Sequence, residues 1–378
     1  MDIEKIKNEL TRCLGCKVMP CAKACPLGVS PHDFIAAAKT GKYADAAALI
    51  AAKNPLPQTC GLVCPDLFCQ KACIRNRIDS AIEIPCIQAE VIKKGGLPPL
   101  SLPQPNGKKA AIIGGGPAGL GALFKLITNG WHVDLFEKSN TLGGVARLIP
   151  EYRLPKTVLD TEIARLTTNN RVTIHLNSEI TDFANLKTQY NGIILAIGEP
   201  NFRTLGIKGE EYCISYKEFL SNPEKYIASK IAICGGGEVA LDCALTATAQ
   251  GSKVEMFVRR RREDMRIMAR DQKELDEKGV IVHALTSITA INEENNTCCL
   301  TTVNNEINTD GKAVHCSGTE CELKGYDHVV QALGSYYPKE NIPEDFILAG
   351  DMTGETGTVV QALASGIAAA HKLISLEQ

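Results

Sequence analysis

The stretch KAAIIGGGPAGLGALFKLITNG, residues 109–130, has the clearest fold signature in this chain. A short apolar run leads into the spacing Gly114-x-Gly116-x-x-Gly119, and an apolar segment of helical length follows. This pattern predicts a strand, a tight turn and a helix whose N-terminus receives a pyrophosphate. The next strand, HVDLFEK, places Glu137 18 residues after Gly119, where an acid accepts hydrogen bonds from a ribose hydroxyl. A turn without any ligand is the alternative, but strand, turn, helix and acid in register favour a dinucleotide site.

The same supersecondary unit returns at residues 230–251, as KIAICGGGEVALDCALTATAQG. Its turn has the spacing Gly-x-Gly-x-x-Ala from Gly235, and the strand KVEMFVRR follows. Arg259 and Arg260 occupy the position of the ribose-binding acid, and arginine there suits a 2′-phosphate. The pattern therefore favours NADPH over NADH. A solvated basic loop is the alternative, because the arginines here exceed what one phosphate needs.

Further strands and a helix continue the α/β pattern to the end of the chain. The expected strands are GIILAIG (192–198), HVVQALGS (328–335) and FILAGDM (346–352), and VVQALASGIAAAHKLI (359–374) is an expected helix. Two strand–turn–helix units predict two doubly wound, Rossmann-like domains with parallel sheets. Between the last strand and the helix, Asp351 can bond a polyol, and the helix N-terminus can face a flavin carbonyl.

Eight cysteines in two runs precede the first glycine turn. They read C-x2-C-x4-C-x3-C-P and C-x3-C-P-x4-C-x3-C, at Cys13, Cys16, Cys21, Cys25, Cys60, Cys64, Cys69 and Cys73. Closely spaced thiolates hold iron–sulfur clusters, and two 4Fe-4S clusters need about eight ligands. Zinc is the alternative, but zinc sites usually pair C-x2-C arms, and only Cys13 and Cys16 have that spacing. Cys86 is a ninth cysteine in this region.

The region around the cysteines is expected to be helical. Ser30 is placed to cap a helix that starts at Pro31, and a second helix is expected to stop at Pro55. Residues 96–107, rich in Gly and Pro, predict a linker.

Composition excludes several classes of function. A net charge of −2 offers no basic field for nucleic acid. The charged N-terminus is not a signal peptide, and no apolar run reaches the roughly 18 residues of a membrane span. We therefore expect a cytoplasmic protein with reduced cysteines and no membrane partner. Cys316 and Cys321 have the spacing of some redox disulfides, although their place in the chain favours an inert surface pair.

The combination resembles the electron-input subunits of bacterial dihydropyrimidine dehydrogenase and the small subunit of glutamate synthase. The resemblance covers nearly the whole chain. It rests on CLGCKVMPCAKACP, NPLPQTCGLVCPDLFCQKAC, AIIGGGPAGL, EKSNTLGGV, IPEYRLPKTVLDTEI, CGGGEVALDCA, VRRRREDM and AGDMTGETGTVVQAL.

The resemblance implies that the two cysteine runs interleave. One cluster would be held by Cys13, Cys16, Cys21 and Cys73, and the other by Cys25, Cys64, Cys69 and Gln88. Cys60 would be a non-ligand. Cys86 lies two residues before Gln88, and a thiolate binds iron better than a carboxamide does, so Cys86 stays an alternative to Gln88.

The resemblance also implies FAD at the first turn and NADPH at the second. The expected FAD residues are Gly114, Gly116, Pro117, Ala118, Gly119, Glu137, Lys138, Gly144, Arg153, Gly350, Asp351 and Thr358. The expected NADPH residues are Gly235, Gly237, Glu238, Val239, Arg259, Arg260, Arg266 and Gly334.

We therefore expect an α/β oxidoreductase with three functional parts. Residues 1–95 would carry two 4Fe-4S clusters, 108–203 and 328–378 would bind FAD, and 204–327 would bind NADPH. No acid–base constellation for a second substrate is visible, so electrons would pass to a partner subunit that holds FMN or another acceptor. The alternatives are a free-standing diaphorase or ferredoxin–NADP reductase, and a non-catalytic cluster-bearing scaffold.

Overall fold

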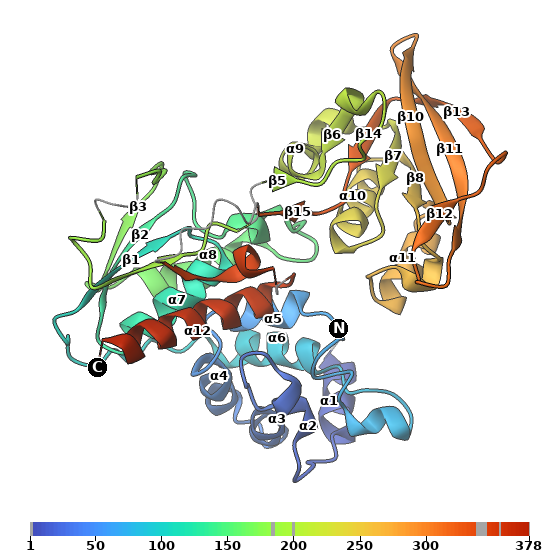
Figure 1. Ribbon diagram of the computed structural model, residues 1–378. Helices are drawn as coiled ribbons and strands as arrows, with labels where there is room; N and C mark the ends of the chain where they lie inside the picture. The colour runs from blue at the N-terminus through green and yellow to red at the C-terminus, as the bar shows by residue number, and fades with distance from the viewer. Residues whose placement is uncertain (1–2, 183–185, 199–200, 338–345, 355–356, 378) are drawn as a thin grey trace. The chain divides into compact units, whose positions relative to one another are not determined.

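The computed structural model describes residues 3–182, 186–198, 201–337, 346–354 and 357–377. The chain forms two compact units. Figure 1 shows the chain coloured by residue number, from blue at the N-terminus to red at the C-terminus. The first unit comprises Met1–Arg147, Glu151–Pro200 and Tyr337–Gln378, and the second comprises Leu148–Pro150 and Asn201–Tyr336.

The N-terminal part of the first unit is helical, as expected. It contains α1 (Ile3–Arg12), α2 (Pro20–Ala24), α3 (Pro31–Lys39), α4 (Tyr43–Ala51), α5 (Pro57–Val63), a 3-10 turn (Ile74–Arg77) and α6 (Ile84–Gly95). The cap predicted at Ser30 is confirmed, since its hydroxyl accepts from the Asp33 N–H and Pro31 opens α3. Phe34, Ile50 and Ile87 are fully buried between these helices.

A parallel sheet forms the rest of the first unit. Its strands are β1 (Lys109–Ile113), β2 (His132–Phe136), β3 (Val172–His175), β4 (Gly192–Leu195) and β16 (Ile347–Leu348), in the order β16-β4-β1-β2-β3. The helices of this part are α7 (Pro117–Ile127), α8 (Lys156–Thr167) and α12 (Val359–Leu376). This is the expected doubly wound fold.

Helix α12 runs along α7 (Figure 1). The two backbones come close because Gly366 has no side chain, and a Cβ there would overlap the Ala118 carbonyl. By length and composition alone α12 could cross a bilayer, so the expectation that no apolar segment has that length is wrong. In the structure its Leu363 and Ala370 are fully buried against the rest of the unit.

The expected linker joins the helical part to the sheet without a helix or strand in residues 96–107, all of which are described. It is fixed at two carbonyls. Arg165 Nε donates to Pro98 over 2.6 Å, and the Arg171 guanidinium donates to Pro103 over 2.5 Å. The linker is therefore bonded along part of its length to the part of the first unit formed by the parallel sheet with α7, α8 and α12, which we call the flavin-type fold.

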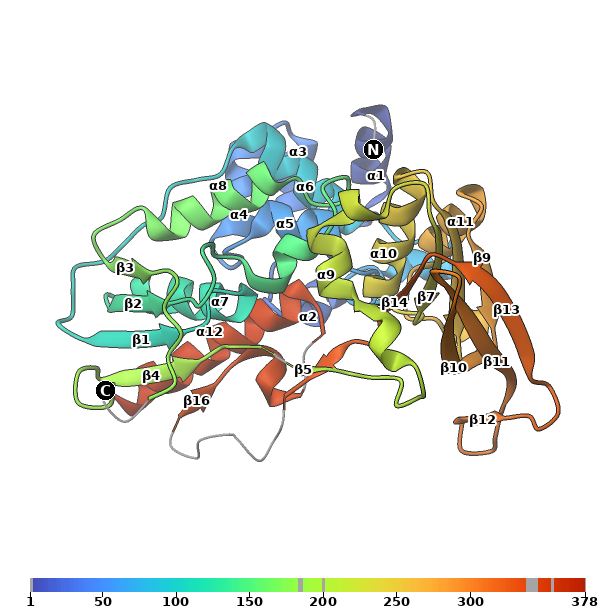
Figure 2. The same ribbon diagram turned by 90° about the horizontal axis from the view of Figure 1, so that it is seen from above.

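The second unit has its own five-stranded parallel sheet, in the order β6-β14-β7-β8-β9. Its strands are β6 (Cys213–Ser215), β7 (Lys230–Cys234), β8 (Lys253–Val258), β9 (Ile281–Ala284) and β14 (His328–Gln331), with α9 (Tyr216–Ser221), α10 (Glu238–Ala249) and α11 (Ala269–Glu277). Figure 2 shows α9 and α10 beside this sheet.

The expected domain boundary at residue 328 is wrong. β14 pairs with β6 on one side and β7 on the other, and its Val329 and Val330 are fully buried there. The second unit ends after a short ladder between β5 (Asn201–Phe202) and β15 (Ser335–Tyr336). A buried apolar strand looks the same in sequence whichever sheet it joins, so only pairing could assign it.

An antiparallel sheet, which the sequence analysis does not anticipate, follows β9. It contains β10 (Thr286–Glu294), β11 (Thr297–Ile307), β12 (Ala313–His315) and β13 (Cys321–Tyr326). Asn295 and Asn296, both with positive φ, join β10 to β11 as the residues of a tight hairpin.

Candidate flavin, nucleotide and iron–sulfur sites

The first glycine turn joins β1 to α7, with Gly116 at the N-cap and Pro117 in the first turn. Glu137 follows β2, and its Oε2 accepts from the Gly115 N–H over 2.7 Å. Its Oε1 accepts from the Ser139 N–H over 2.9 Å. The structure therefore brings the sequence-predicted acid to the turn and fixes its carboxylate there.

Two distant segments also reach the N-terminus of α7. A Cβ on Gly144 would lie 2.9 Å from Gly116 Cα, and a Cβ on Gly350 would lie 2.7 Å from Ala118 Cβ. Gly350 also has φ 76°, which an L side chain rarely adopts. Bare backbone thus surrounds the amide-rich end of a helix, and such a cradle fits a dinucleotide pyrophosphate.

The remaining expected flavin residues lie around this cradle. Asp351 is half-buried in the 3-10 turn Gly350–Thr353, and the Thr358 hydroxyl caps α12 by accepting from the Gln361 N–H. Lys138 is exposed beside Glu137, and Arg153 is half-buried just before α8. Glu355 and Thr356 of the same sequence motif lie outside the described residues.

The second glycine turn joins β7 to α10, with Gly237 at the N-cap and Glu238 and Val239 opening the helix. Arg266 reaches this turn from a later segment. Its N–H donates to the Gly236 carbonyl over 2.9 Å, and it forms a β-bridge with Gly237. Gly334, after β14, accepts from the Arg203 N–H.

The arginines after β8 separate into groups with different surroundings. Arg262 donates to Asp276 Oδ1 over 2.6 Å and to the Gln272 carbonyl of α11. Arg259 and Arg266 are exposed, and Arg260 is half-buried. More arginines follow β8 than one phosphate needs, and Arg262 explains part of this surplus because it forms an ion pair with α11.

Four cysteines from both runs line one cavity in the helical part. They are Cys13, Cys16, Cys21 and Cys73, the set that the resemblance assigns to the first cluster. The apolar side chains of Ile35, Ile82 and Ile84 complete the cavity wall. Burial, with the neighbouring Cys73 and Cys13 thiols, raises the pKa of Cys21 to about 11.

A second group of thiols lies deeper. The Cys64 thiol is hydrogen-bonded to Cys60, and this bond together with burial raises the pKa of Cys64 well above its ordinary value. Cys25 and Cys69 interact with the same thiol, and burial and Cys25 raise the pKa of Cys69 to about 12. Cys60 is thus a fourth thiol that the sequence analysis sets aside. The i,i+4 spacing of Cys60 and Cys64 was its only signal.

Crowded, buried thiols favour a cation that takes their protons. Within the described ranges, no three His, Cys, Asp or Glu side chains are close enough to hold a single metal ion. A zinc site would need its sulfur ligands about 2.3 Å from one ion, whereas a 4Fe-4S cluster takes one thiolate at each of four separate irons. The donor set therefore fits clusters better than zinc, and all sixteen cysteines are free thiols.

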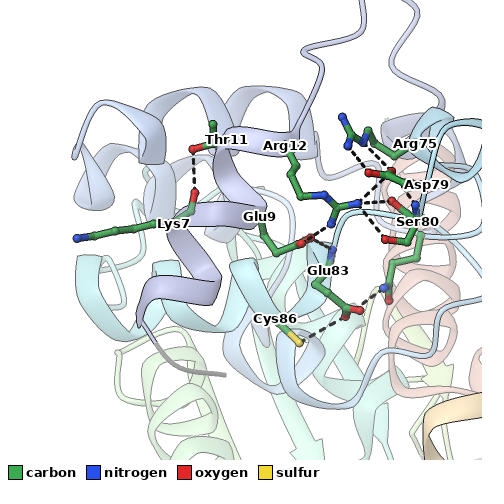
Figure 3. A network of polar contacts seen from close by, with 10 residues as sticks. Lys7, Glu9, Thr11, Arg12, Arg75, Asp79, Ser80, Glu83 and Cys86 are labelled. Atoms are coloured by element: carbon green, nitrogen blue, oxygen red, sulfur yellow. Dashed lines mark hydrogen bonds and ion pairs between the residues drawn. The ribbon is translucent and has the colours of Figure 1, made fainter.

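Gln88 and Cys86 both belong to α6, but their side chains have different neighbours. Gln88 is buried, and its Nε2 donates to the Pro57 carbonyl at the start of α5 over 2.7 Å. The Cys86 sulfur lies 3.9 Å from Glu83 Oε2, as Figure 3 shows. Gln88 therefore lies against the helix that carries Cys60, while Cys86 contacts a carboxylate.

A network of polar contacts attaches the segment after Cys73 to α1 (Figure 3). The Arg12 guanidinium donates to Asp79 Oδ1 over 3.1 Å and to the Ser80 carbonyl over 2.7 Å. The Glu83 N–H donates to Glu9 Oε2 over 2.8 Å. Hydrogen bonds from Arg75 and from the Ser80 N–H, with the nearby Arg12, hold the pKa of Asp79 below its ordinary value.

Glu162 of α8 is a residue whose role the sequence analysis misses. Its carboxylate accepts from the N–H groups of Gln58 and Thr59 and from the Thr59 hydroxyl, the last over 2.6 Å. Burial raises the pKa of Glu162 to about 7. A side chain of the flavin-type fold therefore caps the helix that carries Cys60 and precedes Cys64.

The other cysteines have no such surroundings. Cys234, Cys243, Cys298 and Cys299 are buried, as expected of small core residues. Cys321 is exposed at the start of β13, and Cys316 follows β12, so the pair belongs to the antiparallel sheet of the second unit.

Comparison with known proteins finds two families along the chain. Residues 1–95 match the family described as dihydropyrimidine dehydrogenase domain II, 4Fe-4S cluster. Residues 108–336 match the family described as pyridine nucleotide-disulphide oxidoreductase.

Among similar curated proteins is the NAD-dependent dihydropyrimidine dehydrogenase subunit PreT of Escherichia coli, 33% identical over 68% of this chain and 65% of the relative. The small chain of glutamate synthase [NADPH] of Escherichia coli is 30% identical over 72% of this chain and 64% of that chain. The NADP(+)-dependent formate dehydrogenase subunit beta of Moorella thermoacetica is 30% identical over 72% of this chain and 44% of that relative. The chain therefore spans less than two thirds of the length of these relatives.

Solved structures support the fold. FprA of Mycobacterium tuberculosis in complex with NADPH matches with a TM-score of 0.61 and 17% identity, over 72% of this chain and 84% of that chain. Thioredoxin reductase of T. acidophilum matches with a TM-score of 0.55 and 16% identity, over 71% of this chain and 99% of that chain.

Proposed function

We propose that this chain, which belongs to the pyridine nucleotide-disulphide oxidoreductase family, moves electrons from NADPH through FAD and two 4Fe-4S clusters to a partner catalytic subunit. The observation that supports this proposal most directly is the bond between Glu162 and the start of α5. It joins the flavin-type fold to the helix of the second thiol group within one compact unit.

FAD, when bound, accepts a hydride from a nicotinamide and releases electrons singly, which is chemistry that the cofactor supplies. The chain's residues bind and orient it. The first-turn amides at the start of α7 would face the pyrophosphate, and Glu137 would accept from the ribose. Gly144 and Gly350 keep side chains out of the cradle.

For NADPH, the second glycine turn would take the pyrophosphate, with Glu238 and Val239 at the helix start. Arg259, Arg260 and Arg266 would pair with the 2′-phosphate, because guanidinium groups bind phosphate through two parallel hydrogen bonds. Arg266 supports this role most strongly, since its backbone already pairs with Gly237 in the turn.

For the clusters, we assign Cys13, Cys16, Cys21 and Cys73 to the first site. We assign Cys25, Cys64, Cys69 and Gln88 to the second. Cys60 competes with Gln88 for the last position, because it is hydrogen-bonded to Cys64.

We also propose a cytosolic, hetero-oligomeric protein. The names of three relatives describe them as a subunit, a subunit beta and a small chain. A pyrimidine-reducing or glutamate-forming subunit with FMN or another acceptor is the kind of partner that we propose.

The test is anaerobic reduction of the purified holoprotein. We expect NADPH to bleach flavin absorbance near 450 nm rapidly, and cluster absorbance and EPR signals to follow. Flavin that stays oxidised with NADPH and NADH would reject the proposal and leave the scaffold alternative. Full turnover with dyes, without any partner recovered in co-purification, would instead support a free-standing diaphorase.

A further inference from the structure

We infer that the surface around the first cysteine group is the electron exit and that it docks an acidic electron-carrier protein. The inference rests on the electron path of the proposed function, and it goes beyond that function because it adds a diffusing one-electron carrier as an acceptor besides the bound partner subunit. We call this surface the exit face and define it by two short segments, Leu14–Val18 after Cys13 and Arg75–Ile78 after Cys73. Leu14 and Arg75, one from each segment, line the same cavity.

The second thiol group lies on the side of the flavin-type fold, and the first thiol group lies on the side of the exit face. The second group includes Cys60, which is buried on α5, and Glu162 ties that helix to the flavin-type fold. Cys69 interacts with both Cys25 and Cys21, so the two groups are neighbours. The first group lines a cavity that also includes Leu14 and Arg75 of the exit face. An electron that leaves the flavin fold therefore reaches the exit face last.

Large apolar side chains are exposed on this face. Leu14 is 48% exposed, and Val18 and Ile78 are each 63% exposed. Leu14 lies between the ligands Cys13 and Cys16, and Val18 lies in the loop that leads to Cys21. Apolar groups beside a redox centre are what a transient protein partner covers when it excludes water there.

Basic residues predominate in the two segments that carry these apolar groups. No Asp or Glu occurs at residues 13–32, where Lys17 and Lys23 are exposed. None occurs at residues 67–78, which contain Lys71, Arg75 and Arg77. The whole chain nevertheless has a net charge of −2, so this basic character is local.

Two acids at the edges of these ranges, Asp79 and Asp33, have side-chain partners. Asp79 accepts from Arg12 and from Arg75. Asp33 lies 2.8 Å from the His32 ring nitrogen at the other edge. The charge of Asp79 is thus balanced by Arg12 and Arg75, so the attraction for an acidic partner comes from the other basic side chains, chiefly Lys17 and Arg77.

An acidic carrier fits this face better than a second copy of the same chain, since a copy would bring its own basic face against this one. One NADPH yields NADP⁺, one proton and two electrons, so it would reduce two one-electron carriers in turn. Opposite charge brings the carrier to the face, and the exposed Leu14, Val18 and Ile78 complete the contact.

The experiment uses the holoprotein with an acidic 2Fe-2S ferredoxin as probe and a basic c-type cytochrome as counter-probe. The test variant is Lys17→Glu combined with Arg77→Glu. We expect its kcat/KM for ferredoxin to fall by about tenfold or more at low salt, while the cytochrome rate does not fall. The rate of flavin reduction by NADPH should not change, because both residues belong to the helical part and not to the flavin-type fold.

A matched control reverses a charge at the far end of α6. Lys93→Glu changes the same kind of side chain in the same helical part, and we expect its kcat/KM for ferredoxin to stay within about twofold of wild type. Val18→Ser removes apolar contact without altering charge, so it should weaken binding by about threefold to tenfold at all salt concentrations.

Ferredoxin binding is also measured calorimetrically on the oxidised holoprotein, which needs no NADPH. Equal binding by wild type and the double variant overturns the inference, as does self-association that the double variant abolishes. Failure of NADPH to reduce the flavin overturns the proposed function, and the binding measurement still decides the exit face.

Discussion

Glu162 accepts a hydrogen bond from the Thr59 backbone N–H over 3.0 Å, although 103 residues separate them in the chain. The carboxylate lies at the positive end of α5, whose first N–H groups have no partner inside the helix. It is 1% exposed and is therefore kept from water. One side chain thus fixes the position of the helix that carries Cys60 against the flavin-type fold.

Replacing this carboxylate by an amide should change how stability depends on pH. The pKa of Glu162 is raised from 4.5 to about 7 in the folded protein. The folded protein then holds a proton that the unfolded chain has released, so its stabilisation is full below pH 4.5 and is lost as pH rises through about 7. We expect the melting temperature of Glu162→Gln to rise relative to wild type between these pH values.

Asp160→Asn is the control, because it removes an exposed carboxylate, paired with Arg147, from the same helix. Its melting temperature, relative to wild type, should show no such trend. A constant difference between Glu162→Gln and wild type across the pH range would contradict the prediction.

Adding one methyl group at Gly350 should block FAD binding. The new Cβ would lie 2.7 Å from Ala118 Cβ, and φ is 76°, so the turn must move away from the N-terminus of α7. We expect purified Gly350→Ala to lose most of its flavin absorbance near 450 nm while iron and sulfide stay at wild-type content.

Gly354→Ala separates the two causes of that loss. Gly354 has φ 75°, but a Cβ there would meet nothing within 4 Å. This variant therefore carries the backbone strain, about 1 kcal/mol, without the steric overlap. If both variants lose flavin equally, strain rather than contact with Ala118 explains the effect.

Removing the guanidinium groups beside the second turn should relax the choice of cofactor. A charge-assisted hydrogen bond contributes about 1.5–3 kcal/mol, so Arg259→Ala and Arg266→Ala should each raise KM for NADPH by about tenfold to a hundredfold. The KM for NADH should change little. Steady-state kinetics with both cofactors measures this, and Arg262→Ala, whose side chain pairs with Asp276, is the control.

The eighth cluster ligand can be identified spectroscopically. We expect Gln88→Ala to change the EPR signal of one cluster, since Gln88 is hydrogen-bonded to Pro57 at the start of α5, the helix that carries Cys60. Cys86→Ala should leave the spectrum as in wild type, because its sulfur faces Glu83. Loss of a cluster in Cys60→Ala, with an unchanged spectrum in Gln88→Ala, would assign the position to the thiol instead.

Much of this architecture could be predicted from local sequence patterns. A glycine turn, the helix after it and a capping serine depend on backbone geometry within a few residues, so Gly114–Gly119, Gly235–Ala240 and Ser30 could be recognised without a structure. The same holds for the spacing of the cysteines within each run. The antiparallel strands β10–β13 lacked comparable local signals, apart from the Asn295–Asn296 turn.

By itself, the sequence determined that this chain has two dinucleotide-type turns and enough clustered thiols for iron–sulfur chemistry. The folded structure alone established which distant segments are neighbours. It put Cys73 in one cavity with Cys13, moved β14 into the second sheet, brought Arg266 to Gly237 and set Glu162 on α5. The physical reason is that these contacts join residues far apart in the chain, and packing and strand pairing choose them by burial, which no local pattern encodes.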